Sequence, residues 1–170
     1  KRHSFGGSEV KVTEKLAVAL GFVTIAMAAL LGLAALTLVL PAWASGLSAT
    51  YAEFAEDEHW LQTIVSAPVV FFEFIALEVA YLLWLVHRDR MFSARVYKWV
   101  NLLGVTFLAL AGSFVAIGTW LAIKETLPPA AALVLAAFSI VAAAVGLVTR
   151  SLLVLLRRAT NATQELEGVI

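Results

Sequence analysis

The 170-residue chain contains no cysteine, only four prolines and few charged residues. The absence of cysteine excludes disulfide bonds, thiolate metal sites and cysteine-ligated iron–sulfur clusters. Only 14% of the residues are charged and 62% are hydrophobic, whereas a soluble domain has about 25% charged and about 45–50% apolar residues. A domain of this size exposes much of its surface and has no room to bury this apolar excess. The composition therefore indicates an integral membrane protein.

The chain also lacks a net charge, because twelve Lys and Arg residues balance twelve Asp and Glu residues. This balance gives no electrostatic basis for binding nucleic acid. A nucleophile elbow, a glycine-rich phosphate loop and a histidine-rich metal motif are all missing from the sequence. We therefore expect a protein that is not an enzyme and that uses no cofactor. A membrane enzyme acting on lipid or quinone substrates is the exception kept open.

Four apolar runs are each long enough to cross a hydrocarbon core of about 30 Å, which takes about 20 helical residues. They cover residues 16–40, 61–86, 99–123 and 130–156; Pro41 ends the first, and Pro128–Pro129 precede the last. Backbone polar groups in lipid must be satisfied within their own segment, so all four runs are predicted to be helices. The sequence thus predicts an all-α fold in which residues 1–170 form a single bundle of four transmembrane helices.

Basic residues lie almost entirely on one side of the predicted spans, and only Lys124 falls on the other side. By the positive-inside rule, both termini are predicted to be cytoplasmic, with the chain crossing a bacterial plasma (inner) membrane four times. The loop between the second and third spans is short and basic. Its candidates for contact with anionic lipid head groups are Arg88, Arg90, Arg95 and Lys98. The alternative is that these four residues only set the topology.

The first outer loop, PAWASGLSATYAEFAEDEHW, is the longest segment between predicted spans. Ser48 is a candidate N-cap for a short amphipathic helix whose apolar stripe includes Tyr51 and Phe54. Near the end of the loop, Glu56 and His59 are three residues apart, a spacing that places two ligands on one helical face. They form a possible weak cation site. Acidic residues in an outer loop also follow from the positive-inside pattern alone, and no metal is expected.

Two carboxylates interrupt the second predicted span within FFEFIALEVAYLLW, residues 71–84. Glu73 lies near the middle of the span and Glu78 lies closer to the cytoplasm. Their separation of five positions corresponds to about 140° around a helix, so the two do not form a dyad within one subunit. Arg150, in the fourth span, lies at a depth close to that of Glu78. This predicts a Glu78–Arg150 ion pair, the alternative being that Arg150 extends to the inner interface.

Glu73 has no basic residue at its depth, where an unpaired charge costs about 3 kcal/mol or more. It is expected either to be neutral or to face polar groups such as Thr106, Ser113 or Ser139. A partner protein or a water-filled cavity are the other options. A functional Glu73 would handle protons or cations, and a structural one would be neutral and hydrogen-bonded between helices.

Three parts of the sequence carry a resemblance to a known family: the stretch RMFSARVYKWVNLL, the pair Pro128–Pro129 and the ending LLRRATNATQELEGVI. From its first helix to its C-terminus, the chain resembles a family of small four-helix membrane proteins of unknown function that is common in actinobacteria. Members are often encoded beside a small helix-turn-helix regulator, so the resemblance implies a regulatory or stress-linked role. It implies no catalytic residues.

Two functions are weighed most closely. The first is a non-enzymatic membrane protein that acts through helix–helix interaction, as a regulatory or accessory subunit of a larger membrane complex. The second is a small transporter or a proton or ion pathway that uses Glu73 and Glu78. The expected partners are membrane lipids and either another membrane protein or further copies of the same chain, with no nucleic acid.

Overall fold

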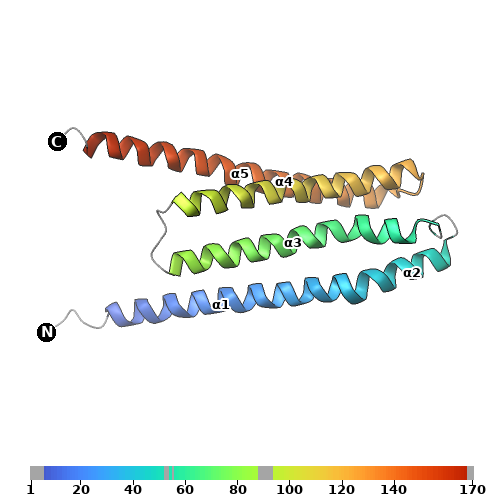
Figure 1. Ribbon diagram of the computed structural model, residues 1–170, viewed down its shortest axis with the longest axis horizontal. Coiled ribbons are helices and arrows are strands. Elements are labelled where there is room, and N and C mark those ends of the chain that lie inside the picture. The colour runs from blue at the N-terminus through green and yellow to red at the C-terminus, as the bar shows by residue number, and fades with distance from the viewer. Residues whose placement is uncertain (1–5, 52–53, 55, 88–93, 168–170) are drawn as a thin grey trace.

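The computed structural model describes residues 6–51, 54, 56–87 and 94–167, and it contains helices and no strands over these ranges. The elements are α1 (Gly6–Ala34), the π-helical turn η1 (Ala35–Val39), α2 (Leu40–Thr50), α3 (Glu58–His87), α4 (Ala94–Ile123) and α5 (Pro129–Glu167) (Figure 1). α1, η1 and α2 form one continuous helical rod, so there are four rods. Each contains a segment long and apolar enough to cross a membrane, which confirms the four predicted helices.

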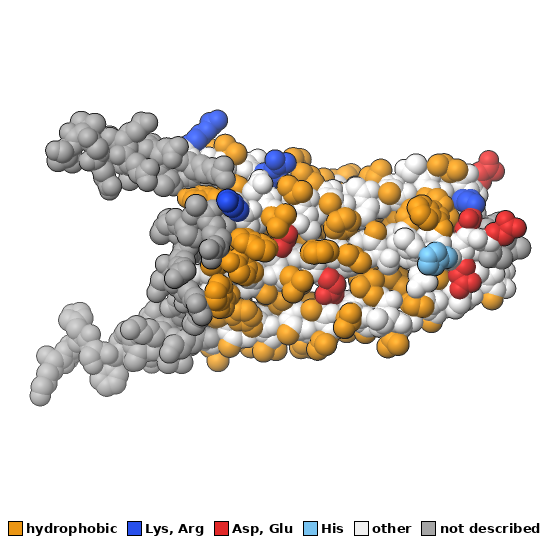
Figure 2. Space-filling view, in the orientation of Figure 1, with side chains coloured by type: hydrophobic (Ala, Val, Ile, Leu, Met, Phe, Trp, Pro, Cys, Tyr) orange, Lys and Arg blue, Asp and Glu red, His pale blue; other side chains and the backbone are white. Residues whose placement is uncertain are grey.

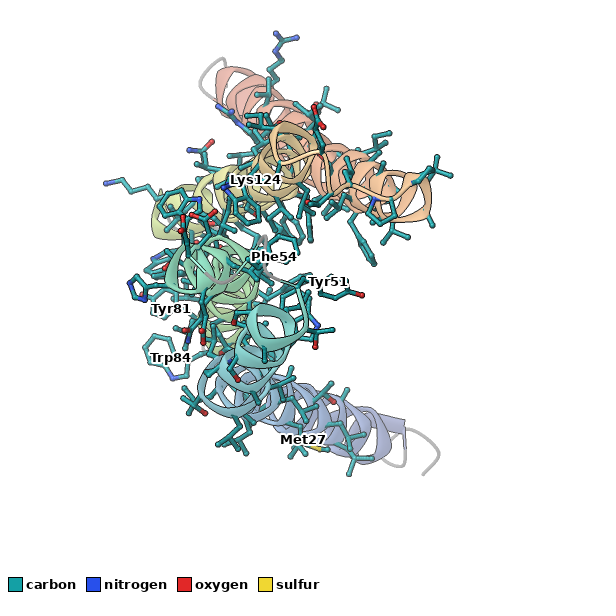
Figure 3. All side chains as sticks on the ribbon, turned by 90° about the vertical axis from the view of Figure 1, so that its right-hand side faces the viewer. Met27, Tyr51, Phe54, Tyr81, Trp84 and Lys124 are labelled. Atoms are coloured by element: carbon teal, nitrogen blue, oxygen red, sulfur yellow. The ribbon has the colours of Figure 1, made fainter. Side chains whose placement is uncertain are left out.

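The four rods form an open row and not a closed bundle. Each rod packs against its neighbours in chain order: α1 and α2 against α3, α3 against α4, and α4 against α5. Seen from one end, the row is curved, with α1 and α5 at its two ends (Figure 3). α1 begins and α5 ends at the same end of the molecule (Figure 1). The inner rods are consequently the more buried ones.

The first rod continues past Pro41, where the sequence predicts that the span ends. In the turn before it, the Leu40 N–H donates to the Ala35 carbonyl, five residues back, so this turn contains one extra residue. Pro41 then lies in the first turn of α2. A proline is tolerated in a first turn, where it has no obligatory N–H bond to make. The π turn thus accommodates the proline without ending the rod.

The separate amphipathic helix predicted to start at Ser48 is not found among the described residues of this region. Ser48 lies inside α2, and its hydroxyl donates to the Ala44 carbonyl oxygen at 2.7 Å. The chain leaves the helix only at Tyr51, which has an extended backbone. The prediction failed because it depended on a helix end at Pro41.

Helix α4 ends in a Schellman arrangement. Glu125 has a left-handed backbone (φ 57°), its N–H donates to the Ala122 carbonyl, and the Thr126 N–H donates to the Leu121 carbonyl. Pro129 then begins α5, a favoured first position for proline.

The segment that precedes α3 is attached to the far end of α4. Lys124, just after α4, forms an ion pair with Asp57. The ring of Phe54 lies 6.2 Å from that of Trp120, and both Phe54 and Lys124 are labelled in Figure 3. These contacts hold one end of the α2–α3 pair against α4. Two described residues of the connection between the first two rods, Phe54 and Asp57, are therefore packed or paired against α4.

α4 and α5 make the closest helix crossing in the row. A methyl group on Gly146 would lie 2.9 Å from the Gly104 carbonyl oxygen, so the two backbones touch at this point. Two helical turns away, the Ser139 hydroxyl donates to the Ala111 carbonyl oxygen at 3.1 Å. Small residues and interhelical hydrogen bonds of this kind are what hold helices together in lipid.

Candidate functional site

The second predicted span contains the only Asp or Glu residues inside the described parts of the four predicted spans. Their side chains contact different neighbouring helices. Both Glu73 and Glu78 project from α3. Glu78 contacts Thr106 of α4. Glu73 lies against Gly32 of α1. This arrangement agrees with the prediction, made from their spacing, that the two side chains do not share a helix face.

Glu78 is almost fully buried, with 4% of its surface exposed. Its Oε1 lies 2.8 Å from the Thr106 hydroxyl oxygen, which is also 3.1 Å from the Leu102 carbonyl oxygen. A hydroxyl has one proton, so Thr106 donates either to the carboxylate or to the carbonyl. When it donates to Leu102, it is free to accept a hydrogen bond from a protonated Glu78. The second carboxyl oxygen, Oε2, is buried and has no hydrogen-bond partner among the described residues.

The predicted ion pair between Glu78 and Arg150 is wrong. Arg150 is exposed, and its aliphatic stem lies over Gly104, with Cγ 2.6 Å from where a methyl group on that glycine would stand. Gly104 and Thr106 are two residues apart on α4, which is about 200° around the helix. Glu78 and Arg150 therefore contact nearly opposite sides of α4. Thr106 occupies the place that the prediction assigned to the arginine.

Glu73 is partly exposed and faces α1 across a groove. A methyl group on Gly32 would lie 1.7 Å from Glu73 Oε1, so the carboxyl group occupies the space that a larger residue would fill. The groove between α1 and α3 holds a cavity of about 590 Å³. Its lining is apolar except for Glu73 and Thr24. None of the polar side chains considered for Glu73 reaches it: Thr106 contacts Glu78, Ser113 donates to the Leu110 carbonyl and Ser139 to the Ala111 carbonyl.

The possible cation site in the first outer loop is weakened by the position of the helix start. α3 begins at Glu58, so Glu56 lies in a bend before the helix and does not share a helical face with His59. Both side chains are exposed. Among the described residues, no three His, Asp or Glu side chains gather in a way that would hold a metal ion. The neighbouring Asp57 is paired with Lys124.

The predicted lipid-facing cations are described only in part. Arg88 and Arg90 lie outside the described residues, as does the side chain of Arg95, whose backbone belongs to the first turn of α4. Lys98 is exposed on α4. Figure 2 shows Lys and Arg side chains mainly toward the end where α1 begins. Asp and Glu side chains gather at the opposite end, where Lys124 also lies, and occur between the two ends as well.

One residue that matters for the site was missed as a contact of the carboxylates. Gly32 follows Ala28 by four residues, a spacing of small residues that suits close helix packing. The same signal fits a glycine that makes room for a side chain on the facing helix. A small residue at the depth of Glu73 on a neighbouring span is the sequence signal that points to Gly32.

Comparison with known proteins identifies the family. A family described as "Protein of unknown function (DUF2975)" matches residues 42–170, which include α3, α4, α5 and nearly all of α2. No curated protein and no solved structure gives a significant match. Because the match covers most of the chain, the protein belongs to this family of unknown function, and its four apolar helices indicate a multi-pass membrane protein.

Proposed function

We propose that this protein is a non-enzymatic membrane protein that binds another membrane protein through its helices, as a regulatory or accessory subunit of a larger complex. We further propose that it lies in a bacterial plasma membrane with both termini in the cytoplasm. The charge asymmetry supports this orientation. The family resemblance adds an actinobacterial source and a gene beside a helix-turn-helix regulator, which suit a regulatory role.

The observation that carries the proposal is a cavity on the concave side of the row. The cavity measures about 370 Å³ and has lining residues from four helices: Trp43 of α2, Leu61 of α3, Trp120 of α4 and Leu135 of α5. An apolar side chain inserted here would contact all four helices at once. Helices associate in lipid through such packing, since lipid tails are as apolar as the side chains that they cover.

The partner favoured by this shape is a transmembrane helix of a different protein. The cavity lies where the row stays open, so a helix laid along the concave side would contact both the α2–α3 pair and the α4–α5 pair. The most apolar window of α1, in contrast, has no buried residue, and Met27 lies on the outer side of α1 with 59% of its surface exposed (Figure 3). That side is exposed and apolar, which suits contact with lipid.

Site-specific photo-crosslinking in native membranes tests the proposal. Val134 lines the cavity and its neighbour Leu133 does not, so a photoreactive residue at 133 is a control at the same depth. We expect position 134, and not 133, to give one discrete adduct with a different membrane protein, identified by mass spectrometry. A cavity-filling Ala131→Phe change should remove that adduct without lowering the amount of protein in the membrane. An adduct of two copies of this chain, or equal labelling at both positions, would contradict the proposal.

The second candidate is a small transporter or a proton or ion pathway that uses Glu73 and Glu78. It is favoured by the absence of a basic partner for either carboxylate among the described residues. The directions of the two side chains argue against a single continuous path, because Glu73 points toward α1 and Glu78 toward α4. Flux into liposomes that disappears in Glu73→Gln and in Glu78→Gln would support this function, and flux equal to that of empty liposomes would exclude it.

A further inference from the structure

The groove between α1 and α3 has the dimensions and lining of a small-molecule site. Its cavity of about 590 Å³ falls within the range of about 300–1,000 Å³ typical of ligand pockets. Such sites combine mostly apolar walls with a few placed polar groups. Here the polar groups are Glu73 of α3 and Thr24 of α1, while Leu31, Phe72 and Val79 contribute apolar walls. The groove therefore offers one charge in an apolar setting.

The carboxyl group lies against Gly32 of α1 in this groove. Gly32 provides the space into which Glu73 Oε1 fits, because any larger residue would overlap it. Helix α3 spans about 45 Å by helix rise, and Glu73 lies about 22 Å from its first residue, which is close to the middle of the span. A ligand reaching this carboxyl group therefore enters sideways from the bilayer between α1 and α3.

Nothing in the described part of the chain compensates the charge of Glu73. No hydrogen bond or ion pair is found for its carboxyl group there. The Lys and Arg side chains described are Lys98, Lys124, Arg150 and Arg158, and all belong to α4, α5 or the turn between them. None of them lines the groove. A charge at this depth is unfavourable unless it is neutralised or paired, so an ionised Glu73 needs a counter-ion from outside the described residues.

The chemistry of the groove selects the kind of counter-ion. Calcium takes six to eight oxygen ligands and magnesium demands six in octahedral geometry, while the groove supplies one carboxylate and one hydroxyl. An organic cation needs no such coordination, and its apolar body can pack against the apolar lining of the groove. Phe72 lines the same cavity, and aromatic faces attract such cations.

We propose that the groove between α1 and α3 binds hydrophobic monovalent organic cations from the bilayer, with Glu73 as their counter-ion and Gly32 making room for its carboxylate. This activity goes beyond a role as an accessory subunit. It requires neither the partner helix on the concave side nor transport across the membrane, so its test is independent of both.

Equilibrium binding of radiolabelled tetraphenylphosphonium to the full chain in nanodiscs tests the proposal. We expect saturable binding of one cation per chain, a loss of affinity of at least tenfold in Glu73→Gln, and unchanged binding in the matched control Glu78→Gln. Triphenylphosphine oxide, a neutral compound of similar shape, should not compete. Equal affinity of the wild type and Glu73→Gln, or full competition by the neutral compound, would overturn the proposal.

Two further variants separate a specific site from a folding defect. Ala76 lines the groove and carries no charge, and Ala76→Phe should block binding while circular dichroism and size-exclusion profiles stay unchanged. Glu73→Asp keeps the charge on a shorter side chain and should restore at least part of the affinity that Glu73→Gln loses. Binding that survives Ala76→Phe, or a Glu73→Asp variant as weak as Glu73→Gln, would place the cation elsewhere.

Discussion

The α4–α5 interface and the α1–α3 interface both contain a glycine at the helix crossing, but one glycine faces a backbone carbonyl and the other faces a side chain. Gly146 of α5 faces the backbone carbonyl of Gly104. Gly32 of α1 faces the carboxyl group of Glu73 at the end of a flexible side chain. At its crossing the first interface has its two backbones in contact, and two turns away it carries an interhelical hydrogen bond from Ser139. Beyond that bond the same two helices separate around a groove of about 470 Å³. The second contains a cavity and a charge without a partner in the described residues.

This difference suggests different roles for the two interfaces. The α4–α5 interface maintains the fold, and the α1–α3 interface has space for a ligand. In lipid, helix association depends on packing and hydrogen bonds, and the hydrophobic effect contributes little. The α4–α5 pair uses both and buries Ala142 beside Leu110 and Ala111. The α1–α3 pair leaves a cavity beside Glu73. Stability should therefore be concentrated in the α4–α5 pair.

The largest effect is expected for Gly146→Ala. The new methyl group would stand 2.9 Å from a backbone oxygen, so the helices must separate. Overpacking of this kind costs about 1–3 kcal/mol, and we expect a loss of about 2 kcal/mol relative to Gly112→Ala, which shares the gain from replacing a helical glycine. Denaturant titration in detergent, followed by tryptophan fluorescence, measures it. Gly112→Ala is the control, because a methyl group on Gly112 meets nothing within 4 Å. Equal effects of the two changes would show that the crossing is not tight.

An intermediate effect is expected for Thr106→Val, which tests the contact between α3 and α4. Valine has nearly the same shape but leaves Glu78 with no hydrogen-bond partner on either oxygen. An unsatisfied buried polar group costs about 1–3 kcal/mol, and we expect about 1–2 kcal/mol. The same titration applied to Thr106→Val combined with Glu78→Leu should recover most of the loss, since both polar partners are then removed. No recovery in the double variant would argue against this contact.

The smallest effect on stability is expected for Gly32→Ala. The methyl group displaces the Glu73 side chain, which can rotate toward the cavity at a cost of about 0.5–1.5 kcal/mol. Replacing a helical glycine by alanine offsets about 1 kcal/mol of that, so the net change should be below about 0.5 kcal/mol. Unfolding measured beside Gly146→Ala checks this directly. A loss as large as that of Gly146→Ala would remove the distinction between the two interfaces.

The helices were largely predictable from the sequence because lipid leaves few alternatives for long apolar runs. α5 begins at Pro129, one residue before the predicted start of the fourth run, and α4 ends at Ile123 as predicted but begins five residues earlier than residue 99, at Ala94. The first rod was predicted too short. A proline normally marks a helix end, and nothing in the sequence indicates that the preceding turn would change its hydrogen-bonding pattern.

The partners of the intramembrane charges were much less predictable. Depth follows from counting residues along each span, and on depth alone Arg150 is a reasonable match for Glu78. Which side of α4 each of them contacts depends on how the helices are rotated about their axes. That rotation is decided by close packing, here by Gly104 lying under Arg150, and not by the polar residues themselves. The hydroxyl of Thr106 was among the considered partners, but for the wrong glutamate.

The π turn at Ala35–Val39 has a consequence for the phase of the first rod. Twelve residues separate Gly32, which faces α3, from Ala44, which is 0% exposed where α2 packs on α3. In a regular helix these two residues would lie about 120° apart. With one extra residue taken up in a turn, the difference falls to about 20°. The turn therefore works as a one-residue phase correction. Without it, the bulky neighbour Trp43 would rotate toward the site of Ala44, and one rod could not present small residues to α3 along its whole length.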